Sequence, residues 1–134
     1  MRYRLLEHTA DAMVEAHGES LGERFANAAY AMFDQMTDAS RISPTGEVRV
    51  ELKAEAREQL LVDFLQELLF LHDTENLVFG EFDVETDGTS LTARARGEAF
   101  DGSRHPKRSV VKGVTYHGLS FDDARKTITV LFDV

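Results

Sequence analysis

The segment from Glu47 to Glu55 alternates apolar and charged residues without a break, and few backbone conformations suit such a pattern. Successive side chains of a β-strand point to opposite faces, so the alternation predicts a strand with one dry face and one face in water. The segment 127–134 nearly repeats the pattern, with Asp133 at an outward position. The dry faces need apolar partners elsewhere in the chain. The alternating apolar residues are Val48, Val50, Leu52, Ala54, Ile128, Val130, Phe132 and Val134.

Two longer segments repeat apolar residues every three or four positions, which is the spacing of one face of an α-helix. The first spans about 20–38 and opens on Ser20-Leu21-Gly22-Glu23, which has the spacing of a capping box. The second spans about 57–73 and carries a wide apolar stripe opposite a charged side. The sequence therefore predicts two amphipathic helices. Their apolar residues are Leu21, Phe25, Ala28, Ala29, Met32, Phe33 and Met36, then Leu60, Leu61, Phe64, Leu65, Leu68, Leu69 and Leu71.

Shorter stretches bounded by turn residues predict the remaining strands. Residues 77–86 and 89–100 form a predicted hairpin about Asp87-Gly88, a dipeptide that tolerates the positive φ angles of a tight turn. No repeat or linker interrupts the chain, so 1–134 is expected to form one domain. Short connections between neighbouring strands predict an α+β fold, with two helices packed on one face of a mostly antiparallel or mixed β-sheet in a single compact domain. The other predicted strands are 2–7, 12–17, 109–117 and 118–122.

The composition restricts both the expected location and the chemistry of any metal site. No stretch approaches the roughly 18 apolar residues of a membrane helix, and the first residues lack the apolar core of a signal peptide. The absence of cysteine excludes disulfides and thiolate zinc sites and fits a cytoplasmic protein. Any metal must be held by carboxylates, histidines, carbonyls or a terminal carboxylate, which favours hard cations.

The net charge of −9, from 24 acidic and 15 basic residues, argues against autonomous binding of RNA or DNA. Affinity for phosphate backbones rises with the number of cations engaged, and this chain has few to offer. One dense basic patch stands out, Arg104-His105-Pro106-Lys107-Arg108, with Lys112 close behind. Two interpretations remain open. The patch is a solvated loop, or it docks an acidic protein partner or an RNA or nucleotide that the partner holds.

Two short stretches near the ends of the chain hold the candidates for a metal site. His8 and Asp11 lie in a short connection between predicted strands, although H-x-x-D is a weak pattern and Asp11 would also suit a turn cap. Asp133 is the penultimate residue, on a strand whose alternate positions are apolar. If that strand is central and Asp11 lies beside its end, Asp11, Asp133 and the carboxylate of Val134 would converge. Such a concentration of charge requires a cation or raised pKa values. The alternative for Asp133 is an exposed terminal acid.

No catalytic motif is visible in the sequence, so we do not expect an enzyme. The chain has no phosphate-binding glycine-rich loop, no G-x-S-x-G and no H-E-x-x-H. His72-Asp73-Thr74-Glu75 ends the second helix with two acids that oppose the helix dipole. This arrangement is either a functional feature or a solvated helix exit, and the second interpretation needs no further assumption.

Longer motifs follow one another in a fixed order along nearly the whole chain, and in that order they resemble the archease family. The last of them, Phe132-Asp133-Val134, is similar to the acidic and apolar terminus of that family. The chain departs from the family at Lys107 and Arg108, so the resemblance implies no role for these two cations. The preceding motifs are His8-Thr9-Ala10-Asp11, Leu21 to Ala29, Met32-Phe33-Asp34, Leu60 to Leu69, Leu71 to Glu75, Gly97-Glu98, Arg104-His105 and Val111 to His117.

The resemblance implies a compact α+β fold and a role as a non-catalytic cofactor of the RNA ligase RtcB in tRNA splicing and repair. Such a cofactor promotes guanylylation of the ligase and lets it turn over many times. The resemblance also implies a bound divalent cation, expected to be calcium, with ligands at Asp11, Asp133 and the terminal carboxylate of Val134. Partner contacts are expected from His8, Arg104, His105 and Lys112.

The sequence leaves two other functions open beside this one. The archease family has also been connected with a tRNA methyltransferase, for which the chain would act as a chaperone or specificity modulator. An independent metal-dependent hydrolase with clustered carboxylates is a third, less favoured interpretation.

Overall fold

The computed structural model describes residues 1–6 and 11–134, which form seven strands, two α-helices and one short 3-10 helix. The strands are β1 (Tyr3–Leu6), β2 (Ala12–His17), β3 (Gly46–Lys53), β4 (Leu77–Thr86), β5 (Ser90–Ala99), β6 (Gly113–Asp122) and β7 (Thr127–Asp133). The helices are α1 (Leu21–Met36), η1 (Ala39–Arg41) and α2 (Arg57–Glu75).

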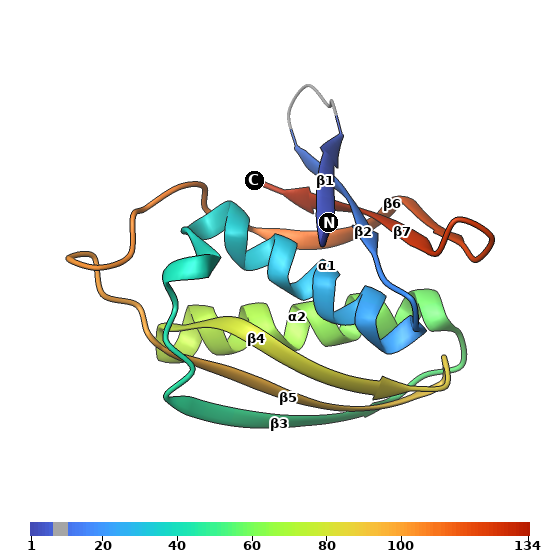
Figure 1. The fold of residues 1–134 in the computed structure, drawn as a ribbon, viewed down its shortest axis with the longest axis horizontal. Coiled ribbons are helices and arrows are strands. Elements are labelled where there is room, and N and C mark those ends of the chain that lie inside the picture. The colour runs from blue at the N-terminus through green and yellow to red at the C-terminus, as the bar shows by residue number, and fades with distance from the viewer. Residues whose placement is uncertain (7–10) are drawn as a thin grey trace.

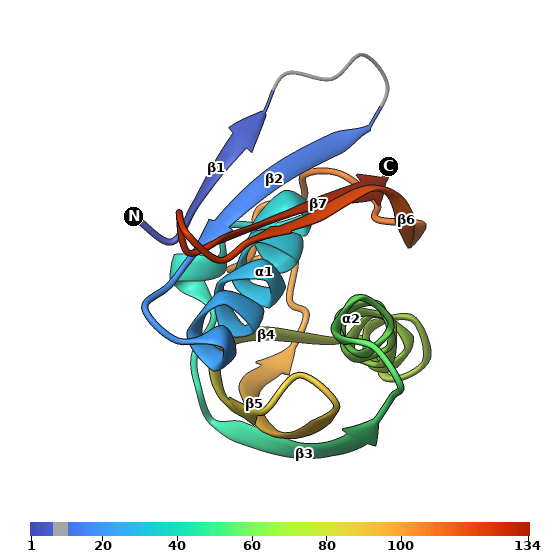
Figure 2. The same cartoon turned by 90° about the vertical axis from the view of Figure 1, so that its right-hand side faces the viewer.

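The strands form two antiparallel sheets, one four-stranded in the order β1-β2-β7-β6 and one three-stranded in the order β3-β5-β4. α1 and α2 lie in a layer between them, as Figure 1 and Figure 2 show. The α+β class and the antiparallel pairing are therefore confirmed. The expected single sheet with both helices on one face is replaced by two sheets that share one helical layer.

The physical reason is that each sheet has one apolar face to cover. Val14 and Val130 of the four-stranded sheet and Ala93 and Ala95 of the three-stranded sheet are all buried. The apolar stripe of α2 is wide enough to contact both sheets, because its buried residues include neighbouring positions. They are Leu60, Leu61, Val62, Phe64, Leu65, Leu68 and Leu69.

Local signals set the ends of both helices close to the predicted positions. The hydroxyl of Ser20 accepts the backbone N–H of Glu23 at 3.0 Å and so caps α1, as its spacing predicted. α2 ends at Asn76, which has a φ of 58° and gives its N–H to the carbonyl of His72. A left-handed residue at this place is a common way to satisfy the last carbonyls of a helix.

The predicted strands at 109–117 and 118–122 need correction, because they form one strand, β6, which starts at Gly113. Arg108 gives its backbone N–H to the last turn of α1 and not to a sheet. Within β6 the pairing with β7 shifts between Thr115 and Ser120, so the ladder is irregular over 116–119. The boundary predicted between 117 and 118 falls in this irregular segment, and the first residues of the predicted strand belong to the connection.

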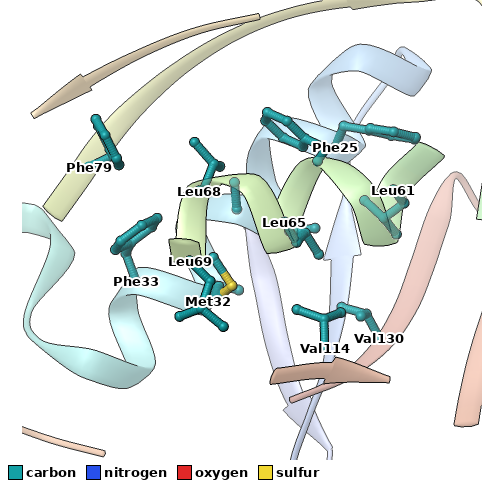
Figure 3. Packing of buried hydrophobic residues seen from close by; sticks show 14 of the residues in the cluster. Phe25, Met32, Phe33, Leu61, Leu65, Leu68, Leu69, Phe79, Val114 and Val130 are labelled. Carbon is teal, nitrogen blue, oxygen red and sulfur yellow. The ribbon is translucent and has the colours of Figure 1, made fainter. Parts of the chain in front are cut away.

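The core fills the space between the sheets. Phe33 of α1 meets Phe79 of β4 edge to face, with ring centroids 5.5 Å apart, and Phe25 stacks near Phe64 of α2 at 6.4 Å. Figure 3 shows Leu61 and Leu65 of α2 between Phe25 and the valines Val114 of β6 and Val130 of β7. Burial of one such side chain contributes roughly 1.5–3 kcal/mol. Among the described residues, no helix is long and apolar enough to cross a membrane.

We predict that Leu65→Ala lowers the free energy of unfolding by about 2–5 kcal/mol, because it leaves a cavity in the layer that both sheets share. Leu65 is fully buried, whereas Phe70 on the same helix is 58% exposed. Phe70→Ala should therefore change the free energy of unfolding by less than about 0.5 kcal/mol. Urea unfolding followed by circular dichroism measures both, and equal effects would contradict the placement of α2.

Candidate metal and partner site

β7 lies in the middle of the four-stranded sheet, between β2 and β6. Its pairing with β2 reaches Ala12 opposite Phe132. Asp11 directly precedes Ala12 and Asp133 directly follows Phe132, so the same register continued by one residue would set them opposite each other. Residues opposite each other in antiparallel strands have Cα atoms roughly 4.5–5.5 Å apart and direct their side chains to the same face. The two predicted carboxylate ligands therefore belong to one end of this sheet.

The strand end that carries Asp133 is held on its other side by β6. The backbone N–H of Lys112 donates to the carbonyl oxygen of Asp133 at 2.6 Å, and Gly113 is paired with Asp133 in the ladder. The Asp133 side chain is exposed, while Val134 is half-buried and packs against the core. Asp133 thus has a defined place in the sheet, and Lys112 lies beside it.

The chemistry of this set fits a hard cation. Asp11, Asp133 and the carboxylate of Val134 offer only oxygen atoms, which calcium and magnesium prefer. In the part of the chain that the structure describes, no three His, Cys, Asp or Glu side chains gather as a metal-binding group. The predicted set contains only two such side chains, so it would have to be completed by the carboxylate of Val134 and by water. His8 lies outside the described residues.

The basic loop at 104–108 is folded around Glu98 of β5. Arg104 donates from Nη2 to Oε1 of Glu98 at 2.6 Å, and the backbone N–H of Ser43 donates to Oε2 at 2.7 Å. His105 reaches the same Oε2 from Nε2 at 2.9 Å. These donors, with Arg104 the strongest, lower the pKa of Glu98 to about 2. One carboxylate therefore ties the loop to the three-stranded sheet.

His105 is not placed to contact a partner, which corrects that part of the prediction. The residue is only 1% exposed, and its ring packs on Phe100 with centroids 5.6 Å apart. Nδ1 accepts the backbone N–H of Asp101 at 2.9 Å, so Nε2 carries the proton given to Glu98. The ring orders the loop from inside. Arg104, with a side chain 49% exposed, is the neighbour that another molecule can reach.

The other end of the loop is attached to the end of α1. Arg108 donates from Nη1 to the carbonyl oxygen of Asp34 at 2.9 Å and gives its backbone N–H to Met36. Tyr3 donates its hydroxyl to the Asp34 carboxylate at 2.6 Å. Burial, aided by that acceptor, raises the pKa of Tyr3 to about 12. Arg104 and His105 are thus bound into a structured connection and do not join Asp11 and Asp133 at the end of β7.

The exit of α2 has an ordinary structural explanation. His72 hydrogen-bonds through Nδ1 to the carbonyl oxygen of Leu77 at 2.9 Å, while Asn76 closes the last turn. A cavity of about 210 Å³ adjoins this exit, with Asp73 and Lys107 in its wall. The contacts favour the solvated helix exit over a functional role for this segment.

Comparison with known proteins decides the family. The model of the archease protein family (MTH1598/TM1083) matches residues 3–134. The chain belongs to the archease family. The archease of Methanothermobacter thermautotrophicus is 44% identical over 125 residues, which cover 90% of this chain and 89% of that protein. The archease of Pyrococcus furiosus is 41% identical over 120 residues, with 87% and 84% covered.

Solved structures agree with the archease fold. The solution structure of protein 1598 from Methanobacterium thermoautotrophicum matches with a TM-score of 0.83 and 41% identity, over 99% of both chains. An archease from Thermotoga maritima, described as a possible chaperone, matches with a TM-score of 0.61 over 98% of this chain and 96% of that one. Its identity of 21% supports the fold alone.

Glu98 is the residue of this region that sequence reasoning missed. The sequence marks Glu98 only as part of the motif Gly97-Glu98, and no role is predicted for it. The position of Glu98 could have indicated its role, because it is an acidic residue near the end of a predicted strand, shortly before the basic loop. Its contact with Ser43, which is far away in sequence, depends on the pairing of β3 with β5.

We predict that Glu98→Gln lowers the free energy of unfolding by about 1–3 kcal/mol, because the amide loses the charge that three donors share. The pKa of Glu98 in the folded chain, about 2, lies below its ordinary 4.5. The unfolded chain therefore binds the proton first as the pH falls. The stabilisation is complete above about pH 4.5 and is lost as the pH falls toward 2.

The measurement is urea unfolding between about pH 7 and pH 2.5, the range over which the linkage acts. The difference between the wild-type chain and Glu98→Gln should shrink as the pH falls, and a constant difference would contradict the assignment. Glu81→Gln, an exposed carboxyl on β4, serves as the control and should change stability little at any pH.

Proposed function

We propose that this archease is a non-catalytic activator of an RtcB-type RNA ligase and promotes guanylylation and multiple turnover of that enzyme. Family membership supports the proposal, together with an acidic composition that makes independent RNA binding unfavourable. The observation that supports it is the register of β2 on β7, whose last pair, Ala12 with Phe132, adjoins Asp11 and Asp133 at one end of an interior strand. In this proposal a divalent cation, calcium in the first place, is bound there by Asp11, Asp133 and Val134.

The position of this site suits a contact with a partner's reaction centre. Asp133 and Lys112 are exposed, and the ladder between β6 and β7 holds their backbones in place. Such a rigid end costs little ordering entropy when it docks. The cation would position a triphosphate or hold the chain segments in a shape that the ligase recognises, and both roles require the same carboxylates.

We predict that Asp11→Asn and Asp133→Asn each abolish stimulation of multiple-turnover ligation when RtcB is limiting. Each substitution removes one negative charge with little change in shape, so calcium affinity should fall by about tenfold or more. Ligation assays with and without a chelator and calorimetric calcium titration measure the two effects. Stimulation by both variants at the wild-type level would refute the proposed site.

Two controls separate loss of the site from loss of the fold. Glu55→Gln removes an exposed carboxyl from the turn before α2 and should leave stimulation and calcium binding unchanged. Urea unfolding without calcium should give similar stability for Asp133→Asn and the wild-type chain, since Asp133 is exposed.

Lys112 is proposed to contact the ligase beside the cation. Lys112→Ala should weaken the complex with RtcB by about tenfold without lowering calcium affinity, because a cation at a docking surface acts on association and not on the metal. Surface plasmon resonance with immobilised ligase measures the affinity. Arg41→Ala, an exposed cation in η1, is the control and should bind as the wild-type chain does.

The second candidate is a chaperone or specificity modulator of a tRNA methyltransferase. The Thermotoga maritima archease, described as a possible chaperone, is the observation in its favour, and at 21% identity it is a weak one. This function predicts a stable complex with the methyltransferase and suppression of its aggregation, with no dependence on Asp133. Light scattering of the heated enzyme, with the wild-type chain or Asp133→Asn added, distinguishes the two candidates.

A further inference from the structure

β3 is an open edge of the three-stranded sheet. Its eight residues pair with β5 on one side, and in the described structure no strand pairs with the other side. It lies at the border of the molecule in both Figure 1 and Figure 2. A long edge strand offers unpaired backbone N–H and C=O groups to another strand. Edges of this kind are commonly blunted by bulges, prolines or charged side chains, and β3 has no bulge or proline but carries charges at its outward positions.

The outward side chains of β3 alternate in charge as well as in polarity. From one end to the other they are Glu47, Arg49, Glu51 and Lys53, all exposed. Between them lie Val48, Val50 and Leu52, which face the helical layer, and the first and last of these three are only half-buried. When the strand is reversed, the order negative, positive, negative, positive becomes positive, negative, positive, negative. Each charge of one strand can therefore lie opposite a charge of the other sign on a reversed copy.

Pairing β3 antiparallel with its own copy, centred on Val50, brings every outward charge opposite its complement. This register sets Glu47 against Lys53 and Arg49 against Glu51, and two-fold symmetry makes each contact twice. The smallest shift that keeps both dry faces on one side moves one strand by two residues. It sets Arg49 against Arg49, or Glu51 against Glu51, and like charges directly opposite each other destabilise a sheet. A shift by four residues restores opposite charges but pairs only part of the strand, so the centred register, which pairs the strand from Glu47 to Lys53, is favoured.

The surroundings of Arg49 favour this pairing. Across β5 its opposite residue is another arginine, Arg94, so its neighbour within the sheet repels it. It pairs with Glu51 of its own strand at 2.6 Å, with the two side chains 58% and 62% exposed. Such an exposed pair contributes little. A second strand would give each of these side chains an opposite charge directly across the new ladder.

We propose that β3 is a homodimerisation edge, at which two copies join their three-stranded sheets into one six-stranded antiparallel sheet about a two-fold axis. The partner is a second copy of this chain, because the edge is self-complementary in charge, as an isologous contact requires. The contact is a single strand pair, smaller than the roughly 800 Å² per partner of a standard interface. We therefore expect association at concentrations between about 10 µM and 1 mM.

The test is charge exchange across the two-fold axis. Glu51→Arg places two arginines opposite each other at both central contacts, and Arg49→Glu places two glutamates there. Each substitution should weaken dimerisation by about tenfold or more in sedimentation equilibrium. The double variant Arg49→Glu/Glu51→Arg restores both contacts with exchanged signs. Its dimerisation should return to within about threefold of that of the wild-type chain.

An equimolar mixture of the two single variants gives an independent readout. In the mixed dimer the two central arginines of the Glu51→Arg chain meet the two central glutamates of the Arg49→Glu chain, so all outward contacts are attractive. We expect a heterodimer at concentrations where each variant alone is monomeric. Glu85→Arg is the matched control, because Glu85 and Glu51 flank the same residue, Thr92, from the two edges of the sheet. It should dimerise as the wild-type chain does.

Three results would overturn the proposal. The first is a monomer at every concentration up to about 1 mM. In that case β3 does not pair with its own copy, and it either stays unpaired or binds a strand of another protein. The second is a dimer that none of the substitutions weakens, which would place the contact on another surface. The third is a double variant as weak as the single ones, which would exclude this register. Urea unfolding of each variant shows whether its fold is retained.

Discussion

One helical layer must cover two apolar sheet faces at once, and the rest of the structure depends on that constraint. α1 packs chiefly against β4 and β2, while α2 packs chiefly against β6 and also touches the three-stranded sheet. Phe33 of α1 packs on Phe79 and Phe82 of β4. Phe25 packs on Phe64 of α2 and Phe121 of β6. A small chain gains stability from this arrangement because the two helices remove apolar area from water on both sides. It also means that neither sheet forms its buried face without the helices.

The division into two sheets decides which strands have a neighbouring strand on both sides. β7 lies between two neighbours, so the end that carries Asp133 is held in place, and β5 is enclosed in the same way. β3 stays open on one side because its sheet, in the described part of the chain, has only three strands. A candidate binding site therefore sits on an interior strand of one sheet. A candidate self-association surface sits on an unprotected strand of the other.

Several cations of the described residues are already paired with acids of the same chain. Arg104 is committed to Glu98, Arg108 to Asp34, and Arg57 to Asp123. Cations that are already paired contribute less to binding phosphates, because binding must first separate them from their acids. This reinforces the acidic composition as an argument for action through a protein. The basic loop looks like a nucleic-acid-binding patch in the sequence. In the structure its main contacts are within the chain, to β5 and to the end of α1.

The sequence by itself determined both helices, the α+β class and most strand positions, since these follow from periodicity and capping at residues such as Ser20. It also singled out Asp11 and Asp133 by type and position. Only the tertiary structure decided that the strands divide into two sheets and that β7 is central. It alone revealed that His105 faces inward and that Glu98 organises the basic loop. These features depend on contacts between residues far apart in the chain, such as Ser43 with Glu98, and on which face of a segment becomes buried. A local sequence pattern specifies neither the distant contacts nor the buried face, because the same alternation or run of charges is compatible with more than one arrangement of neighbouring elements.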